Sequence, residues 1–266
     1  NSVKSIGDRA FQEDVKLKNI KIPNSVTSIG GSAFAGCTSL ESIEIPNSVT
    51  NIGGWAFDRC SSLKGLKIPS SVISMGDTAF YKYSVNSDSK SITITGVSND
   101  FEQHNQATYT LEMPSEIDGK IVTNIGEWVF YRYGLLKEVK IPNSVTSIGG
   151  SAFKDCTSLE SIEIPNSVKS IGDRAFQEDV KLKNIKISNS VTSIGDAAFQ
   201  DCTSLENIEI PNSVTNIGEW VFYGCIELKN AKILGKKTII GSEAFNECKK
   251  VLVRCYKYSE VEKYVK

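Results

Sequence analysis

A period of 23 residues runs through nearly the whole chain. Phenylalanine marks the period, and a glycine stands four residues before each copy. The marking residues are Phe11, Phe34, Phe57 and Phe80, then Phe130, Phe153, Phe176, Phe199, Phe222 and Phe245. A longer duplication lies over the period, since residues 1–22 are identical in sequence to residues 166–187. Self-similarity at one spacing of this length predicts an array of stacked structural repeats.

Each unit resembles residues 40–62, LESIEIPNSVTNIGGWAFDRCSS. Ile43 and Ile45 alternate with polar residues, which predicts a short strand that ends at Pro46. A return segment begins at Val49, on the opposite side of the unit. The residue after the recurring glycine is often Asp or Glu, and several of these are good helix N-caps. We therefore expect a short helical turn that directs the phenylalanine inward.

A single unit of this kind has too small a core to fold alone. Stacked units bury a continuous apolar column, so neighbouring units stabilise one another. Counting strands gives about eleven coils, and at about 4.8 Å per coil the stack is about 50 Å long. The sequence therefore predicts a solenoid of 23-residue coils.

The repeated pattern LxxIxIPxSVTxIGxxAFxxCxSL resembles the BspA-like class of leucine-rich repeats, which is common in bacterial surface and secreted proteins. The resemblance extends over nearly the whole chain, and the phased copies make it specific. It implies an α/β but β-rich leucine-rich-repeat solenoid, right-handed, with a parallel sheet on its concave side. It also implies adhesion or protein binding at a cell surface.

The period fails once, in the middle of the chain. We expect one continuous solenoid with a first array at 1–84, irregular coils resembling an array-opening unit at 85–120, a second array at 121–255 and a C-terminal capping helix at 256–266. The polar composition of residues 96–107 predicts a loop that bulges from the solenoid. A fusion of two arrays would explain both the irregular coils and the duplication.

Seven cysteines are an odd number and cannot all pair within the chain. Six share one position, three residues after the recurring phenylalanine: Cys37, Cys60, Cys156, Cys202, Cys225 and Cys248. They could form a disulfide or metal framework, or they could be buried structural thiols. Asp14 and Asp179 fill the same position in other units, which a disulfide framework would not allow, so we favour buried thiols. A bridge between Cys248 and Cys255 stays open as an exception.

Lysine and glutamate alternate from coil to coil on the predicted sheet. The column ten residues after the phenylalanine contains Lys21, Glu44, Lys67, Lys140, Glu163, Lys186, Glu209 and Lys232. Adjacent strands lie about 4.8 Å apart, so each charge has opposite charges above and below it. A shifted register would oppose like charges, and we interpret this concave charge ladder as a determinant of register and solubility. A groove for a charged ligand is the alternative.

All three tryptophans lie two residues before a recurring phenylalanine, where most other units carry polar or small residues. We therefore expect them to face outward, with tyrosines close by. Together these aromatic residues form a candidate binding surface: Trp55, Trp128, Trp220, Tyr81, Tyr131, Tyr133 and Tyr223. Exposed aromatic clusters can stack on sugars or anchor protein interfaces. The structural alternative is that they pack over the edges of neighbouring coils.

Charge and motifs exclude several classes of function. The 30 Lys and Arg residues nearly balance the 31 Asp and Glu residues, so no net field attracts nucleic acid or an anionic membrane. No apolar run approaches the roughly 18 residues of a membrane span. The single histidine, His104, lies in the predicted loop, and hydrolase, metalloprotease and nucleotide-binding motifs are missing from the sequence. We expect no catalytic residue, no metal and no cofactor.

The sequence therefore favours a non-enzymatic binding module of a secreted or surface-displayed protein, with any export signal outside this chain. The expected partner is a host or matrix protein. Two alternatives stay open: a structural spacer within a larger surface protein, and glycan binding through the exposed aromatic residues.

Overall fold

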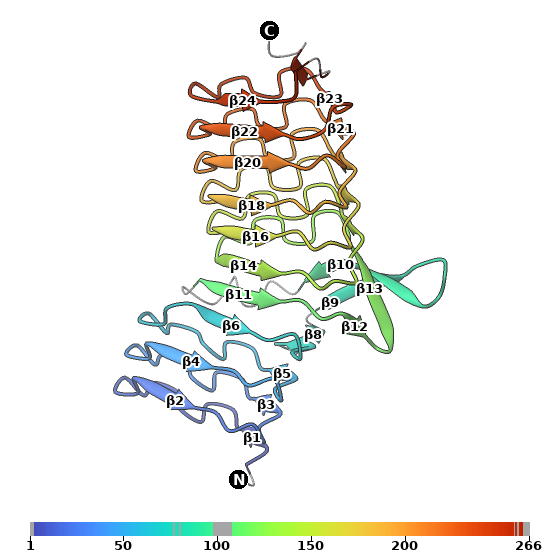
Figure 1. Cartoon of the computed structure of the whole chain (residues 1–266). Helices are drawn as coiled ribbons and strands as arrows, with labels where there is room; N and C mark the ends of the chain where they lie inside the picture. Colours follow the sequence, from blue (N-terminus) through green and yellow to red (C-terminus); the bar gives the residue numbers. More distant parts are fainter. Residues whose placement is uncertain are drawn as a thin grey trace.

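The computed structural model describes residues 3–76, 78–79, 81–97, 108–257, 259 and 261–262, without the side chains of 78–79. These residues form a parallel-strand β-solenoid of about ten turns. Figure 1 shows its turns stacked one above another between the two termini. The predicted β-rich repeat solenoid is confirmed.

The first strand of each unit contributes to one long face of the solenoid, which we call the ladder face (Figure 1). Residues pair in parallel with their equivalents in the next unit, as Ile162 does with Ile185. The strands of this face are β2 (Asn19–Lys21), β4 (Ser42–Glu44), β6 (Leu66–Ile68), β11 (Tyr109–Glu112), β14 (Leu136–Lys140), β16 (Ser161–Glu163), β18 (Asn184–Lys186), β20 (Asn207–Ile210), β22 (Asn230–Ile233) and β24 (Leu252–Arg254). β11 pairs with β6 on one side and with β14 on the other.

The return segment of each unit forms a two-residue strand in a second set of sheets. These strands are β1 (Ser5–Ile6), β3 (Ser28–Ile29), β5 (Asn51–Ile52), β7 (Ser74–Met75), β15 (Ser147–Ile148), β17 (Ser170–Ile171), β19 (Ser193–Ile194), β21 (Asn216–Ile217) and β23 (Ile239–Ile240), with β8 (Thr78–Ala79) antiparallel to β7. The isoleucine of nearly every one points inward because side chains alternate along a strand.

The irregular middle contains two antiparallel pairs that extend to the side of the solenoid (Figure 1). One joins β9 (Tyr81–Val85) to β10 (Ser91–Val97), and the other joins β12 (Glu116–Ile117) to β13 (Lys120–Ile125). β10 also pairs in parallel with β13, which returns the chain to the regular stack.

Several predictions fall wholly or partly on residues outside the described part of the chain. Phe80, His104 and most of the predicted loop, at 98–107, are among them. Of the predicted capping helix at 256–266, residues 261–262 are helical, while 258, 260 and 263–266 lie outside the described residues.

The segment that carries the phenylalanine is a pair of successive turns, so the predicted helical turn is wrong. One residue of each turn has a positive φ, as Ser151 does at 52°, whereas an α-helix has negative φ throughout. The turn amides bond to the next coil, and Phe153 donates to the Ala175 carbonyl at 2.8 Å. Asp173, expected as a helix cap, accepts a hydrogen bond from the Asp196 amide of the next coil at 2.9 Å.

The recurring phenylalanines form two stacks of nearly parallel rings inside the solenoid. One contains Phe11, Phe34 and Phe57, and the other runs from Phe130 to Phe245. Neighbouring ring centroids lie between 4.9 and 5.6 Å apart. Rings inside a stack, such as Phe176, are covered by the coils on both sides, which explains why one unit alone has no stable core.

Candidate binding surfaces

Lysine and glutamate alternate along the ladder face. Lys186 Nζ lies 3.0 Å from Glu163 Oε1, and Lys232 Nζ lies 3.0 Å from Glu209 Oε2. The other predicted members, Lys21, Glu44, Lys67 and Lys140, occupy β2, β4, β6 and β14. The side chains of Lys186 and Glu163 are 79% and 73% exposed, so solvent screens their attraction and this pair contributes little stability.

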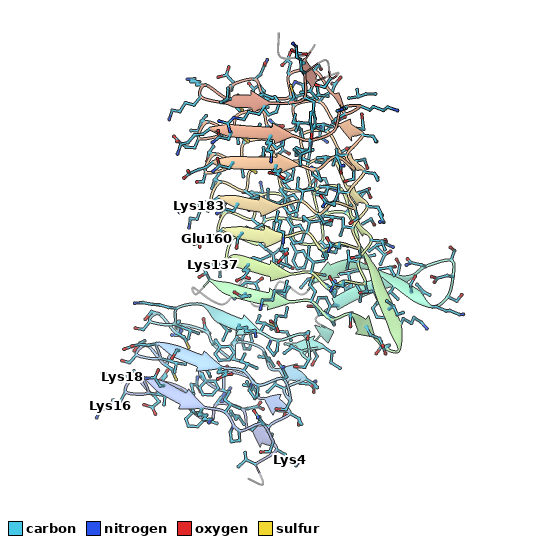
Figure 2. All side chains as sticks on the ribbon, viewed as in Figure 1. Lys4, Lys16, Lys18, Lys137, Glu160 and Lys183 are labelled. Carbon is cyan, nitrogen blue, oxygen red and sulfur yellow. The ribbon has the colours of Figure 1, made fainter. Side chains whose placement is uncertain are left out.

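A second charge column follows the edge of the same face. Figure 2 shows Lys137, Glu160 and Lys183 on successive turns, and Lys137 Nζ lies 3.4 Å from Glu160 Oε2. Further along, Lys229 Nζ lies 3.0 Å from Glu206 Oε2, and this hydrogen bond lowers the pKa of Glu206. Both columns have alternating signs, so the face carries little local net charge.

Glu112 completes the ladder where the period fails, although the 23-residue spacing does not predict it. Its Oε1 lies 3.1 Å from Lys67 Nζ and 2.9 Å from Lys140 Nζ. Partial burial alone would raise the pKa of Glu112, but the bonds to the two lysines outweigh it and lower the pKa. Its distance from the next proline could have predicted this place in the ladder. Glu112 precedes Pro114 by two residues, as Glu44 precedes Pro46.

The ladder face is hollowed over β14, β16 and β18 by a depression of about 730 Å³. Its lining includes the Ser161 hydroxyl, the Asn184 amide and the Glu163–Lys186 pair. A smaller depression of about 360 Å³ continues past Lys186 to Glu209. Both offer hydrogen-bond donors and acceptors, which suits a polar contact surface.

The tryptophan column faces solvent as predicted. The exposed fractions of Trp55, Trp128 and Trp220 are 53%, 52% and 41%. All three have positive φ, at 57°, 61° and 52° respectively. The same column has positive φ in other units, as at Ser32 and Ser151, so the backbone does not select tryptophan there. Each indole leaves about half of its surface in solvent, which is available for contact with a partner.

Two of the predicted surface tyrosines are core residues instead. Tyr133 is 7% exposed, donates its hydroxyl to the Val97 carbonyl at 2.8 Å and packs edge-on against Phe130. It lies three residues after Phe130, at the inward position that cysteine holds in other units, and this spacing could have predicted its burial. Tyr81, on β9, is 4% exposed. Tyr131 and Tyr223 are half-buried.

Trp128, Tyr131 and Arg132 form one exposed cluster, which we call the Trp128 patch. The rings of Trp128 and Tyr131 meet edge to face with centroids 5.1 Å apart. The Arg132 guanidinium lies over the Tyr131 ring, 5.1 Å from its centroid, and Arg132 Nε lies 3.2 Å from Asp155 Oδ2. Trp220 has different surroundings, because its indole donates to Glu243 Oε2 at 3.2 Å.

The column cysteines are buried free thiols. Each donates its Sγ hydrogen to the phenylalanine carbonyl of the preceding regular coil, as Cys156 does to Phe130 and Cys202 to Phe176, both at 3.1 Å. Burial raises the pKa of Cys60 to about 12 and holds that of Cys202 well above its usual value. The bridge left open between Cys248 and Cys255 is not formed.

The described residues contain no group of three or more His, Cys, Asp or Glu side chains that could hold a metal. A helix long and apolar enough to cross a membrane is likewise not found in the described part of the chain.

Parallel strands stacked one per coil over an inward phenylalanine column define a leucine-rich-repeat solenoid, a fold typical of non-catalytic proteins. The chain belongs to the BspA-type leucine-rich-repeat family. The family model, for a BspA type leucine rich repeat region, matches residues 1–113 and 123–252 in 6 copies. A search of curated proteins finds no match.

Two solved structures share the fold. A leucine-rich repeat protein of T. pallidum, TpLRR, is 29% identical with a TM-score of 0.58, and the alignment covers 66% of this chain and 79% of that one. A leucine-rich repeat protein from Bacteroides ovatus is 34% identical with a TM-score of 0.51, over 95% of this chain and 59% of that one. The chain thus spans little more than half the length of the second protein.

Proposed function

We propose that this chain is the binding module of a secreted or surface-displayed protein and that its partner is a protein of the host or the extracellular matrix. The family supports the location, since BspA-like repeats are common in bacterial surface and secreted proteins. Leucine-rich-repeat proteins generally mediate protein interactions, and the module acts by contact rather than by catalysis.

The Trp128 patch is the observation that carries the proposal. Tryptophan, tyrosine and arginine dominate the energy of protein interfaces because each buries a large, amphipathic surface. Trp128 and Tyr131 hold each other in one geometry, and Arg132 is held over Tyr131 by Asp155. This arrangement limits the side-chain entropy that binding would cost.

The test is binding of the purified chain to a panel of immobilised extracellular-matrix proteins at physiological salt, measured by surface plasmon resonance. We expect binding to at least one panel protein. The double variant Trp128→Ala, Tyr131→Ala should bind it at least about tenfold more weakly. Trp220→Ala is the matched control, because it removes a tryptophan of the same column outside the patch and should keep the affinity.

Thermal melting of each variant would show that the solenoid remains folded. Binding that survives the double variant would contradict the role of the patch. If the chain binds none of the panel proteins, a structural spacer is favoured, because a spacer needs no recognition surface.

A further inference from the structure

A third surface depression, in the first repeat array, lies beside Trp55. Its volume is about 520 Å³, within the roughly 300–1,000 Å³ of small-molecule sites. We call it the Trp55 trench. Glycines 30, 31, 53, 54 and 76 line it together with Asp8, Arg9, Ser32, Asn51, Trp55 and Ser74. Ser32, Asn51 and Ser74 supply short polar side chains, and the Trp55 indole that lines the same trench is half-exposed.

The fold requires some of the glycines that line the trench, but not all of them. A Cβ atom at Gly30 would lie 2.5 Å from the Asp8 amide nitrogen, so the close approach of two coils requires that glycine. A Cβ atom at Gly31 would meet its nearest neighbour, the Gly54 carbonyl oxygen, at 3.5 Å, an ordinary contact. Later coils carry Asp173 and Asp196 at the position of Gly31. The trench is therefore open where a side chain would fit.

Trp55 differs from the other tryptophans in its setting. Gly54 precedes Trp55, whereas Glu127 precedes Trp128 and Glu219 precedes Trp220. The indole of Trp55 thus borders an open floor. The Asn51 amide donates to the Ser74 hydroxyl, and both residues line the trench.

We propose that the Trp55 trench binds a pyranose ring of a neutral glycan. The apolar C–H face of the sugar would stack on the Trp55 indole, and its hydroxyls would bond to Asn51, Ser74 and Ser32. Asp8 and Arg9 have opposite charges, so the trench has no net attraction for an anionic ligand. This site shares no residue with the Trp128 patch and does not depend on the protein partner proposed above.

The test is a glycan array probed with the purified chain, followed by titration of the best oligosaccharide by calorimetry. We expect binding to neutral pyranose-containing glycans. Trp55→Ala removes the stacking surface, and Gly31→Asp fills the floor with the residue that later coils carry. Each should weaken binding at least tenfold, while the melting temperature of Gly31→Asp stays close to that of the parent.

Two matched controls separate the trench from general effects. Gly150→Asp makes the same change in the second array, and Trp220→Ala removes another exposed tryptophan; both should bind like the parent. No binding to any array glycan at millimolar concentration would overturn the proposal, as would binding that is unchanged in Trp55→Ala. If the chain binds none of the matrix proteins, the glycan result still stands, because the protein panel tests the Trp128 patch and the glycan array tests the Trp55 trench.

Discussion

Asp14 and Asp179 lie at the same position of two segments with identical sequence, yet Asp14 is exposed and Asp179 is fully buried. The Cys156 amide donates to Asp179 Oδ1 at 2.8 Å, whereas Oδ2 has no hydrogen-bond partner among the described residues. Burial raises the pKa of Asp179 well above its ordinary value. A buried carboxyl with one unpaired oxygen is a weak point in the core.

We expect Asp179→Cys to stabilise the solenoid by about 1–3 kcal/mol, because it replaces that unpaired polar atom with the residue typical of the column. The new thiol would lie where other column cysteines donate to a phenylalanine carbonyl one coil earlier, as Cys202 does to Phe176. Urea denaturation measures the change. Asp14→Cys is the matched control and should not stabilise the solenoid, since Asp14 is exposed and its Oδ1 accepts hydrogen bonds from the Lys16 and Leu17 amides, both at 3.1 Å.

The pKa of Asp179 also predicts a pH dependence. Its folded-state pKa lies above its unfolded value, so the folded state binds the proton more tightly. The resulting stabilisation is complete below the unfolded pKa of about 3.9 and is lost as the pH rises through the folded pKa. Relative to Asp179→Asn, the parent should therefore be more stable at pH 4 than at pH 7. A stability difference that does not change between these pH values would contradict this.

Among the elements, β11 joins the charge ladder of the first array to that of the second. We expect Glu112→Lys to lower the free energy of unfolding by about 1–2 kcal/mol, because it breaks two ion pairs and places three lysines in a row. The loss should be larger at low salt, where screening is weaker.

Two comparisons check the Glu112 prediction. Glu209→Lys should have a smaller effect, because the side chain of Glu209 is 58% exposed and that of Glu112 only 20%. The pKa of Glu112 is lower in the folded state than in the unfolded state, so its ionised carboxylate stabilises the fold at pH values above the unfolded pKa of about 4.3. This stabilisation is lost as the pH falls through the folded-state pKa. If Glu112→Lys and Glu209→Lys lower the free energy of unfolding equally at every salt concentration, the charge ladder does not stabilise the strand register.

Local pattern predicted strands better than turns. Alternation of apolar and polar residues located β4 and its equivalents, because a strand side chain has only two faces to choose between. The turn residues gave no such signal: Asp after glycine suits a helix start, but Asp173 bonds to the next coil. Proximity to Trp128 predicts a surface position for Tyr133, whereas its spacing from Phe130 matches the inward column, and the inward column is correct.

At the scale of the whole molecule, stability comes from contacts between coils. Phe176 stacks on Phe153 and on Phe199, whereas Phe11, in the identical segment at the first coil, stacks on Phe34 and is only partly buried. We expect Phe176→Ala to cost about 3–5 kcal/mol and Phe11→Ala clearly less. Denaturant unfolding of the two variants measures this, and equal losses would contradict the dependence on neighbouring coils.

The sequence by itself determined the solenoid, its inward columns and the alternation of charge, because a fixed period forces equivalent residues into equivalent places. Only the tertiary structure decided which of these equivalent positions are buried and which are exposed. Residues 1–22 and 166–187 have one sequence, yet Asp14 is exposed and Asp179 is buried. Burial depends on the coil stacked above or below, and that neighbour lies 23 residues away, outside any local pattern.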